Sequence, residues 1–178
     1  MKIRWGKIVV FLVCLIPVAL LGFSAYQGSL GANPLEVITH TTGDWTIRFL
    51  LITLAVTPLR QLARLYWLIQ FRRMLGLFAF FYGTLHLTTY LWFDKFFVWH
   101  DIWADVAKRK FITVGFLAFV LMIPLAVTST KGMIRRLGKG WTQLHRLIYV
   151  SAIAGVIHYL WLVKADKSKP LFLSLIHI

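Results

Sequence analysis

The sequence has 178 residues, 59% of them hydrophobic and 16% aromatic, and a formal net charge of +14. Its mean hydropathy of +0.73 exceeds what a water-soluble globule can bury, because such a fold must cover itself with polar side chains. The 20 Lys and Arg against 6 Asp and Glu would indicate nucleic-acid binding in a soluble chain, but here the basic residues lie between apolar runs. The composition therefore predicts a membrane protein and argues against a nucleic-acid partner.

The sequence contains a single cysteine, Cys14, which lies in the first apolar run. It therefore offers no disulfide framework, no C-x-x-C zinc site and no C-x-x-C-H sequence for covalent attachment of haem. Any haem would have to be held by coordination and packing alone.

Apolar runs long enough to cross a bilayer recur along the chain. A helix needs about 20 residues to cross roughly 30 Å of hydrocarbon. The first run is longer than the apolar part of a signal peptide and is followed by others, so we interpret it as a retained helix. The second contains Arg48, Arg60 and Arg64, but arginines near helix ends can reach the headgroups. The predicted full spans are residues 8–26, 45–65, 74–93, 111–130 and 145–163.

A sixth apolar run, residues 170–178, is too short to cross a membrane. We give His177, near its end, no role. The sequence thus predicts an all-α, polytopic transmembrane bundle with five full spans and a truncated sixth. Residues 1–178 are expected to form one transmembrane domain with no soluble domain and no internal repeat.

The charges between the spans predict the orientation of the chain. With the amino terminus inside, most Lys and Arg fall on the cytoplasmic side and all the acidic residues fall outside, which agrees with the positive-inside rule. The tryptophans lie near or beyond the predicted span ends, as in an interfacial aromatic belt. We therefore expect a multi-pass protein with a cytoplasmic amino terminus.

Two of the six histidines lie inside predicted spans. His86 is 7 residues from the outer end of the third span and His158 is 5 from the outer end of the fifth, so both lie roughly 8 to 10 Å below the outer boundary. One intramembrane histidine usually just hydrogen-bonds a neighbouring helix. The matched depth of two favours axial ligation of a haem, and the absence of acidic residues in the spans disfavours a proton relay.

A third histidine, His145, begins the fifth predicted span on the cytoplasmic side. Thirteen residues separate it from His158, which on a regular helix turns the two side chains about 140° apart. At that level the third span offers only Arg72 and Arg73. His145 is therefore a candidate either for a further metal ligand or for a flavin, quinone or propionate site. Two other histidines, in predicted outer loops, are expected to be ordinary surface residues: His40 and His100.

Two basic segments, residues 71–76 and 128–147, face the predicted cytoplasmic side. Topological charge and contact with anionic lipid explain them at least as well as a specific site does. The alternative is an anion site, because guanidinium groups bind phosphate bidentately. The phosphate of FMN or the propionates of haem would suit it. The candidate cofactor-binding residues are Arg72, Arg73, Arg135 and Arg136.

Several motifs in order along the whole chain resemble those of the ferric reductase-like transmembrane family, and most closely its MsrQ (YedZ) branch. The resemblance implies haem b carried by His86 and His158, with His145 as a further ligand candidate, and an FMN or quinone site where electrons enter. It also implies an inner-membrane location in bacteria and a periplasmic molybdopterin enzyme, MsrP, that repairs oxidised methionines. The motifs are GSLGANP (28–34), HTTGDW (40–45), LLITLAVTPLR (50–60), RRMLGLFAFFYGTLHLTTY (72–90), LAVTSTKGMIRRLGKGWTQLH (125–145) and IHYLW (157–161).

The chain departs from the NADPH oxidases and ferric reductases of the wider family. Those proteins carry two histidines on each of two helices and a soluble flavin and nicotinamide domain, whereas the third span here has one histidine. We therefore expect an electron-transfer subunit, fed by a quinone or a flavin reductase and surrounded by lipid, rather than a complete enzyme. The alternatives are a stand-alone transmembrane ferric reductase and a small non-redox transporter or scaffold.

Overall fold

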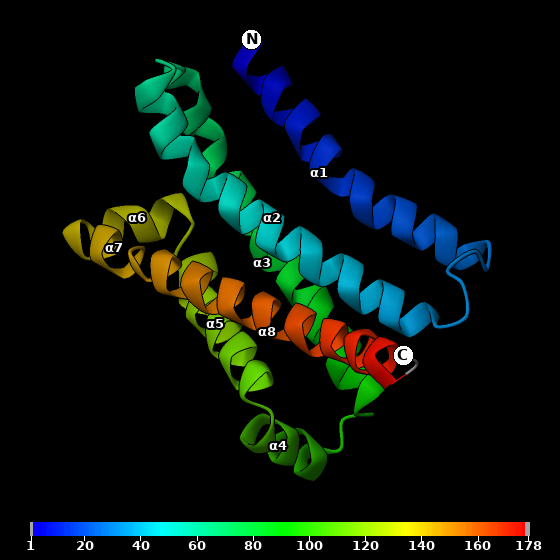
Figure 1. Cartoon of the computed structure of the whole chain (residues 1–178). Coiled ribbons are helices and arrows are strands. Elements are labelled where there is room, and N and C mark those ends of the chain that lie inside the picture. The colour runs from blue at the N-terminus through cyan, green and yellow to red at the C-terminus, as the bar shows by residue number, and fades with distance from the viewer. Residues whose placement is uncertain (1, 177–178) are drawn as a thin grey trace. The chain divides into compact units, whose positions relative to one another are not determined.

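The computed structural model describes the backbone of residues 2–176 and the side chains of residues 5–93 and 95–162. All regular structure in these residues is helical, which confirms the predicted all-α class. The elements are α1 (Lys2–Tyr26), α2 (Pro34–Leu62), η1 (Tyr66–Leu68), α3 (Ile69–Thr89), η2 (Tyr90–Asp94), α4 (Trp99–Lys108), α5 (Lys110–Val127), α6 (Lys131–Leu137), α7 (Lys139–Leu144) and α8 (Leu147–Ile176) (Figure 1).

The chain divides into two compact units, Met1–Phe97 and Val98–Ile178. The first is built on the packing of α2 against α3, and the second on the packing of α5 against α8. Both helix pairs are antiparallel. In the first, Thr39 near the start of α2 contacts His86 near the end of α3. In the second, Phe111 contacts His158, whereas the later Ala118 contacts the earlier Ser151. Each unit is therefore a helical hairpin with further helices added to it.

Within the described residues, three stretches are long and apolar enough to cross a membrane by length and composition: Trp5–Tyr26, Tyr66–Phe93 and Lys110–Val127. They coincide with the first, third and fourth predicted spans. Helices α2 and α8 have 29 and 30 residues, so each is about 45 Å long and exceeds the thickness of the hydrocarbon core. Their assignment as spans, and with it the total of five, stays a prediction.

Helix α2 begins at Pro34, well before the predicted start at residue 45. The side chain of Asn33 accepts a hydrogen bond from the backbone N–H of Glu36 at 3.4 Å and donates one to the Glu36 carboxylate at 2.8 Å. Asn at the N-cap and Pro at the first helical position are both strong start signals. The polar segment that we interpreted as a loop is therefore the first part of α2.

At the other end of the chain, α8 continues through Pro170 to Ile176. The backbone of α8 is thus continuous from the predicted fifth span through residues 170–176 of the predicted sixth segment. Residues 177 and 178, which include His177, lie outside the described residues, as do the side chains from residue 163 onward.

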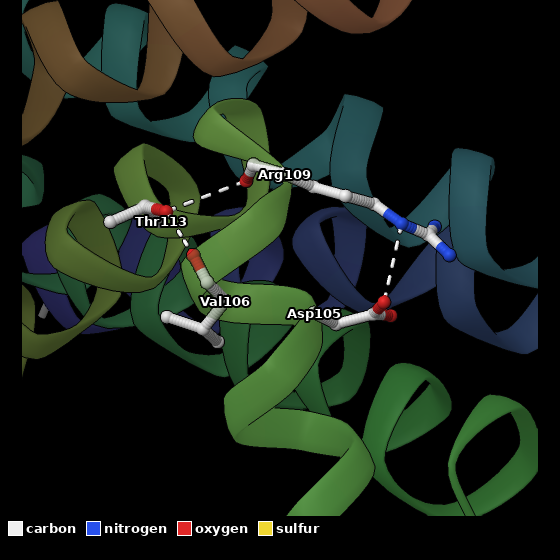
Figure 2. Close-up of polar contacts among 4 residues, drawn as sticks. All are labelled: Asp105, Val106, Arg109 and Thr113. Atoms are coloured by element: carbon white, nitrogen blue, oxygen red, sulfur yellow. Dashed lines mark hydrogen bonds and ion pairs between the residues drawn. The ribbon is translucent and has the colours of Figure 1, made fainter.

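The predicted loop between the third and fourth spans contains a further helix, α4. Its junction with α5 is held by an ion pair of 3.3 Å between Asp105 and Arg109 and by the Thr113 hydroxyl, which donates to the Val106 carbonyl oxygen (Figure 2). Trp99 and Trp103, one turn apart, are exposed. Such an amphipathic helix is typical of a segment that lies in the membrane interface.

In the first unit, Tyr82 of α3 is inserted into the hydrogen-bond ladder of α1. Its hydroxyl donates to the Cys14 carbonyl oxygen at 2.9 Å and accepts from the Val18 N–H at 3.1 Å, two groups that would pair directly in a regular helix. Pro17 lies between them, and proline together with an inserted polar group is a common cause of an opened helix. Tyr82 is 1% exposed and stacks on Phe49, so it fixes α3 against two helices one turn before His86.

Candidate functional site

His86 is half buried near the end of α3 and is held by the backbone of α2. Its Nδ1 lies 2.9 Å from the Thr39 carbonyl oxygen. Because a carbonyl oxygen only accepts hydrogen bonds, Nδ1 carries the proton, and the lone pair of the neutral ring is on Nε2. The hydrogen bond therefore fixes both the tautomer and the orientation of the ring.

Two threonine hydroxyls strengthen this contact. The Thr39 hydroxyl donates to the Thr89 hydroxyl at 3.2 Å, and the Thr89 hydroxyl donates to the backbone carbonyl of His86 at 2.8 Å. Together with the imidazole bond, these links close a ring of three hydrogen bonds, two of which join α2 to α3. We call this ring the threonine clasp.

The His86 ring also packs against a helix surface that lacks a side chain. A methyl group added at Gly43 of α2 would lie 3.1 Å from both Nδ1 and Cε1 of His86. That is closer than ordinary van der Waals contact, so only glycine lets the ring take this position without a shift.

His158 of α8 is held in the same way in the second unit. Its Nδ1 donates to the Phe111 carbonyl oxygen of α5 at 2.7 Å, which again places the lone pair of the neutral ring on Nε2. A methyl group at Gly115 would lie 2.6 Å from Nδ1 and 2.8 Å from Cε1. The backbone of α5 thus approaches this imidazole more closely than α2 approaches His86.

A buried serine joins α8 to α5 two turns before His158. The Ser151 hydroxyl donates to the Ala118 carbonyl oxygen at 2.8 Å, and the serine is fully buried. The register between the two helices is therefore fixed by two side-chain bonds to backbone carbonyls.

His145 does not lie on the helix that carries His158, so the side-chain angle predicted for one continuous helix is wrong. It is the C-cap of α7, two residues before α8 begins. Its ring stacks on Trp141 with centroids 3.8 Å apart, and its Nδ1 lies 3.1 Å from the Trp141 carbonyl oxygen. The indole N–H of Trp141 donates to the Thr128 carbonyl oxygen, so His145 is packed against the end of α5 through Trp141.

The four candidate arginines lie on two helices. Arg72 is half buried and Arg73 exposed on α3, whereas Arg135 and Arg136 are exposed on α6. The two pairs belong to different units, so their common anion site stays a prediction. The histidines expected at the surface, His40 and His100, are both exposed.

The contacts of His86 and His158 are of a kind that metal-binding histidines make. Histidines that bind metal commonly donate their other ring N–H to a backbone carbonyl or a carboxylate, which orients the ring and makes the coordinating nitrogen more basic. Both His86 and His158 donate from Nδ1 to a carbonyl. The donor chemistry in each unit therefore fits a histidine that would coordinate haem iron through Nε2.

Comparison with known protein families agrees with this chemistry. Residues 42–156 match the family described as ferric reductase like transmembrane component. The match begins in α2, ends in α8 two residues before His158 and crosses both units. The chain therefore belongs to the ferric reductase-like transmembrane family.

Curated relatives narrow the assignment. The chain is 55% identical over 173 residues to the protein-methionine-sulfoxide reductase heme-binding subunit MsrQ of Herminiimonas arsenicoxydans. The aligned residues make up 96% of the chain and 79% of that protein. It is 52% identical to the MsrQ subunit of Rhodospirillum rubrum, covering 96% and 83%, and 54% identical to that of Azospira oryzae, covering 89% and 68%. Within the family the chain thus falls in the MsrQ branch. No solved structure shows a significant match.

Proposed function

We propose that this chain is the haem-binding membrane subunit of a protein-methionine-sulfoxide reductase system. The names of its relatives support this function. The observation that carries it is the shared geometry of His86 and His158, each fixed by a carbonyl so that Nε2 is the nitrogen able to coordinate. We also propose that residues 1–178 form one transmembrane domain; the family match, which covers residues 42–156 and parts of both units, supports this.

We propose that His86 and His158 would hold haem b, which would supply one-electron chemistry when bound. Reduction of one methionine sulfoxide takes two electrons and two protons and gives methionine and water, so two successive one-electron transfers are needed. The role of the chain is to hold the ligand nitrogens in place, which the carbonyl bonds of the two imidazoles support. The recipient is a periplasmic molybdopterin reductase of the MsrP type.

Electron entry is proposed on the cytoplasmic side of a multi-pass bacterial inner-membrane protein whose amino terminus is cytoplasmic. The exposed Arg73, Arg135 and Arg136, with the half-buried Arg72, supply positive charge for an FMN phosphate, haem propionates or anionic lipid. His145 is a candidate for a further ligand or for this entry site. The immediate donor would be a quinone or a flavin reductase.

The central test is the absorption spectrum of the protein purified in detergent. A Soret peak and sharp α and β bands in the reduced state are expected, and both should be lost in His86→Ala and His158→Ala. His40→Ala, which changes an exposed histidine, is the matched control and should keep the spectrum. The spectrum of His145→Ala separates its two candidate roles, since loss of a haem signal would assign it as a ligand.

Two outcomes would overturn the proposal. One is a wild-type protein that is colourless although circular dichroism shows it to be helical. The other is reduced protein that oxidised MsrP cannot re-oxidise. The family description keeps a stand-alone ferric reductase as the second candidate, and reduction of Fe³⁺ by the chain in vesicles without any partner protein would favour it.

A further inference from the structure

The contacts of His86 and His158 share one plan. In both units the histidine follows the carbonyl residue by 47 positions, and the glycine that packs on the ring follows the carbonyl residue by four. We call each set of a carbonyl, a glycine and an imidazole a histidine seat. The two sets are Thr39, Gly43 and His86, and Phe111, Gly115 and His158.

Helix geometry explains why the glycine comes four residues after the carbonyl. The Cα–Cβ bond in an α-helix tilts toward the amino terminus, so a side chain covers the turn before its own Cα. A side chain at position 43 or 115 would therefore cover the carbonyl of residue 39 or 111. Glycine uncovers that carbonyl and lets an imidazole from the neighbouring helix reach it.

The same plan extends beyond the two seats, although the sequence alone predicted no internal repeat. A constant shift of 72 residues relates the seats to each other and also brings buried positions into correspondence. The glycines three residues before each histidine, Gly83 and Gly155, are related by this shift. Further pairs that are buried in both units are Leu50 and Met122, Thr53 and Leu125, Val56 and Thr128, Ala79 and Ser151, and Tyr82 and Ala154.

We propose that Gly43 and Gly115 are positioning residues that hold the ligand imidazoles in one tautomer and one orientation. The proposal rests on the proposed function, because it assigns the ligand role to His86 and His158. Glycine in a helix interior is less stable than alanine, so its presence at both equivalent positions is explained by the ring that it admits.

The expected consequence concerns the ligand nitrogen. A hydrogen bond from Nδ1–H to a carbonyl makes Nε2 a stronger electron donor, which stabilises the oxidised iron and lowers the reduction potential. A methyl group at either glycine displaces the ring and lengthens that bond. The midpoint potential should therefore rise, and the ring orientation reported by the low-spin EPR g values should change.

The experiment compares Gly43→Ala and Gly115→Ala in the full chain purified with haem. Gly115→Ala should lose most of its haem per protein, because its methyl would lie 2.6 Å from the ring. Gly43→Ala, at 3.1 Å, should keep haem but with displaced g values and a more positive midpoint potential. Should Gly115→Ala fail to fold, Gly43→Ala still decides the proposal.

Each unit offers a matched control. Gly76→Ala, in the same helix pair as Gly43, would meet nothing closer than Thr53 Cγ2 at 3.5 Å, and Gly132→Ala in α6 would meet nothing within 4 Å. Both should keep native haem content, g values and potential. The proposal is overturned if Gly43→Ala and Gly115→Ala match these controls.

A haem-independent measurement separates this proposal from the proposed function. In ¹⁵N-histidine-labelled protein freed of haem, the nitrogen chemical shifts of His86 and His158 should report protonated Nδ1 in the wild type. They should report a mixture of tautomers in the glycine variants. Wild-type protein that never binds haem would contradict the proposed function alone. Unchanged tautomers in the variants would contradict the proposal that Gly43 and Gly115 position the imidazoles.

Discussion

The two histidine seats share some contacts that orient the imidazole and differ in others. Both use a main-chain carbonyl and a glycine. The first seat adds the threonine clasp, and its glycine leaves more room beside the ring. The second has no clasp among the described contacts and holds its ring more tightly against α5. The comparison teaches that hydroxyl bonds and close packing are two different ways to fix the same imidazole orientation.

The largest expected effect concerns Tyr82, which attaches the first hairpin to α1. The equivalent residue in the second unit is Ala154, which has no hydroxyl. Tyr82→Phe removes the hydroxyl that satisfies the Cys14 carbonyl and the Val18 N–H. Leaving two buried backbone groups without partners should cost about 2 kcal/mol of unfolding free energy. Thermal unfolding in detergent measures this, with Tyr26→Phe, at a 90% exposed residue, as control. A variant as stable as the wild type would show that the Cys14 carbonyl and the Val18 N–H pair with each other when the hydroxyl is absent.

The next effect tests the second hairpin alone. Ser151→Ala removes the bond to the Ala118 carbonyl, at a position where the first unit has the equally buried Ala79. We expect a loss of about 1 kcal/mol of unfolding free energy. Ser29→Ala, which removes an exposed bond to the Ser24 carbonyl, should change stability by less. Equal effects in the two variants would contradict the idea that the buried serine fixes helix register.

The smallest expected effect concerns the threonine clasp. Thr89→Val keeps the shape of the side chain but removes both of its hydroxyl bonds, so a loss of about 0.5 to 1 kcal/mol is expected, with haem content retained. A double-mutant cycle with Thr39→Val measures the coupling between the two hydroxyls. Thr84→Val, at an exposed residue, is the control. Loss of haem in Thr89→Val would mean that the clasp, rather than the carbonyl and glycine, positions His86.

Sequence reasoning proposed His86 and His158 as candidate ligands because an ionisable side chain inside an apolar run stands out. It missed the seats because a main-chain carbonyl has no signature in the sequence. The correspondence was hard to detect because few residues related by the shift of 72 are identical, although Gly43 and Gly115, Gly83 and Gly155, and His86 and His158 are among them. Helix α4 was missed because its polar and apolar residues alternate at helical spacing in a segment too short and too charged to resemble a span.

The start of α2 and the place of His145 show two further limits. Asn33 and Pro34 gave a readable start signal, but the polar residues after them favoured a loop. His145 was assigned to the fifth helix because the basic segment before α8 shows no clear break, whereas the backbone turns at residues 145–146. Boundaries in amphipathic segments depend on packing that a hydropathy pattern does not report.

The acceptor in each seat belongs to the peptide backbone, and every amino acid supplies it. Replacement of Thr39 or Phe111 by another residue type leaves the carbonyl oxygen in place, whereas replacement of Gly43 or Gly115 covers it. A saturation library would therefore show broader tolerance at positions 39 and 111 than four residues later in each helix, with the stricter limit at position 115. A genetic screen replaces side chains, so it would detect the importance of these two carbonyl oxygens only through substitutions at the neighbouring glycines.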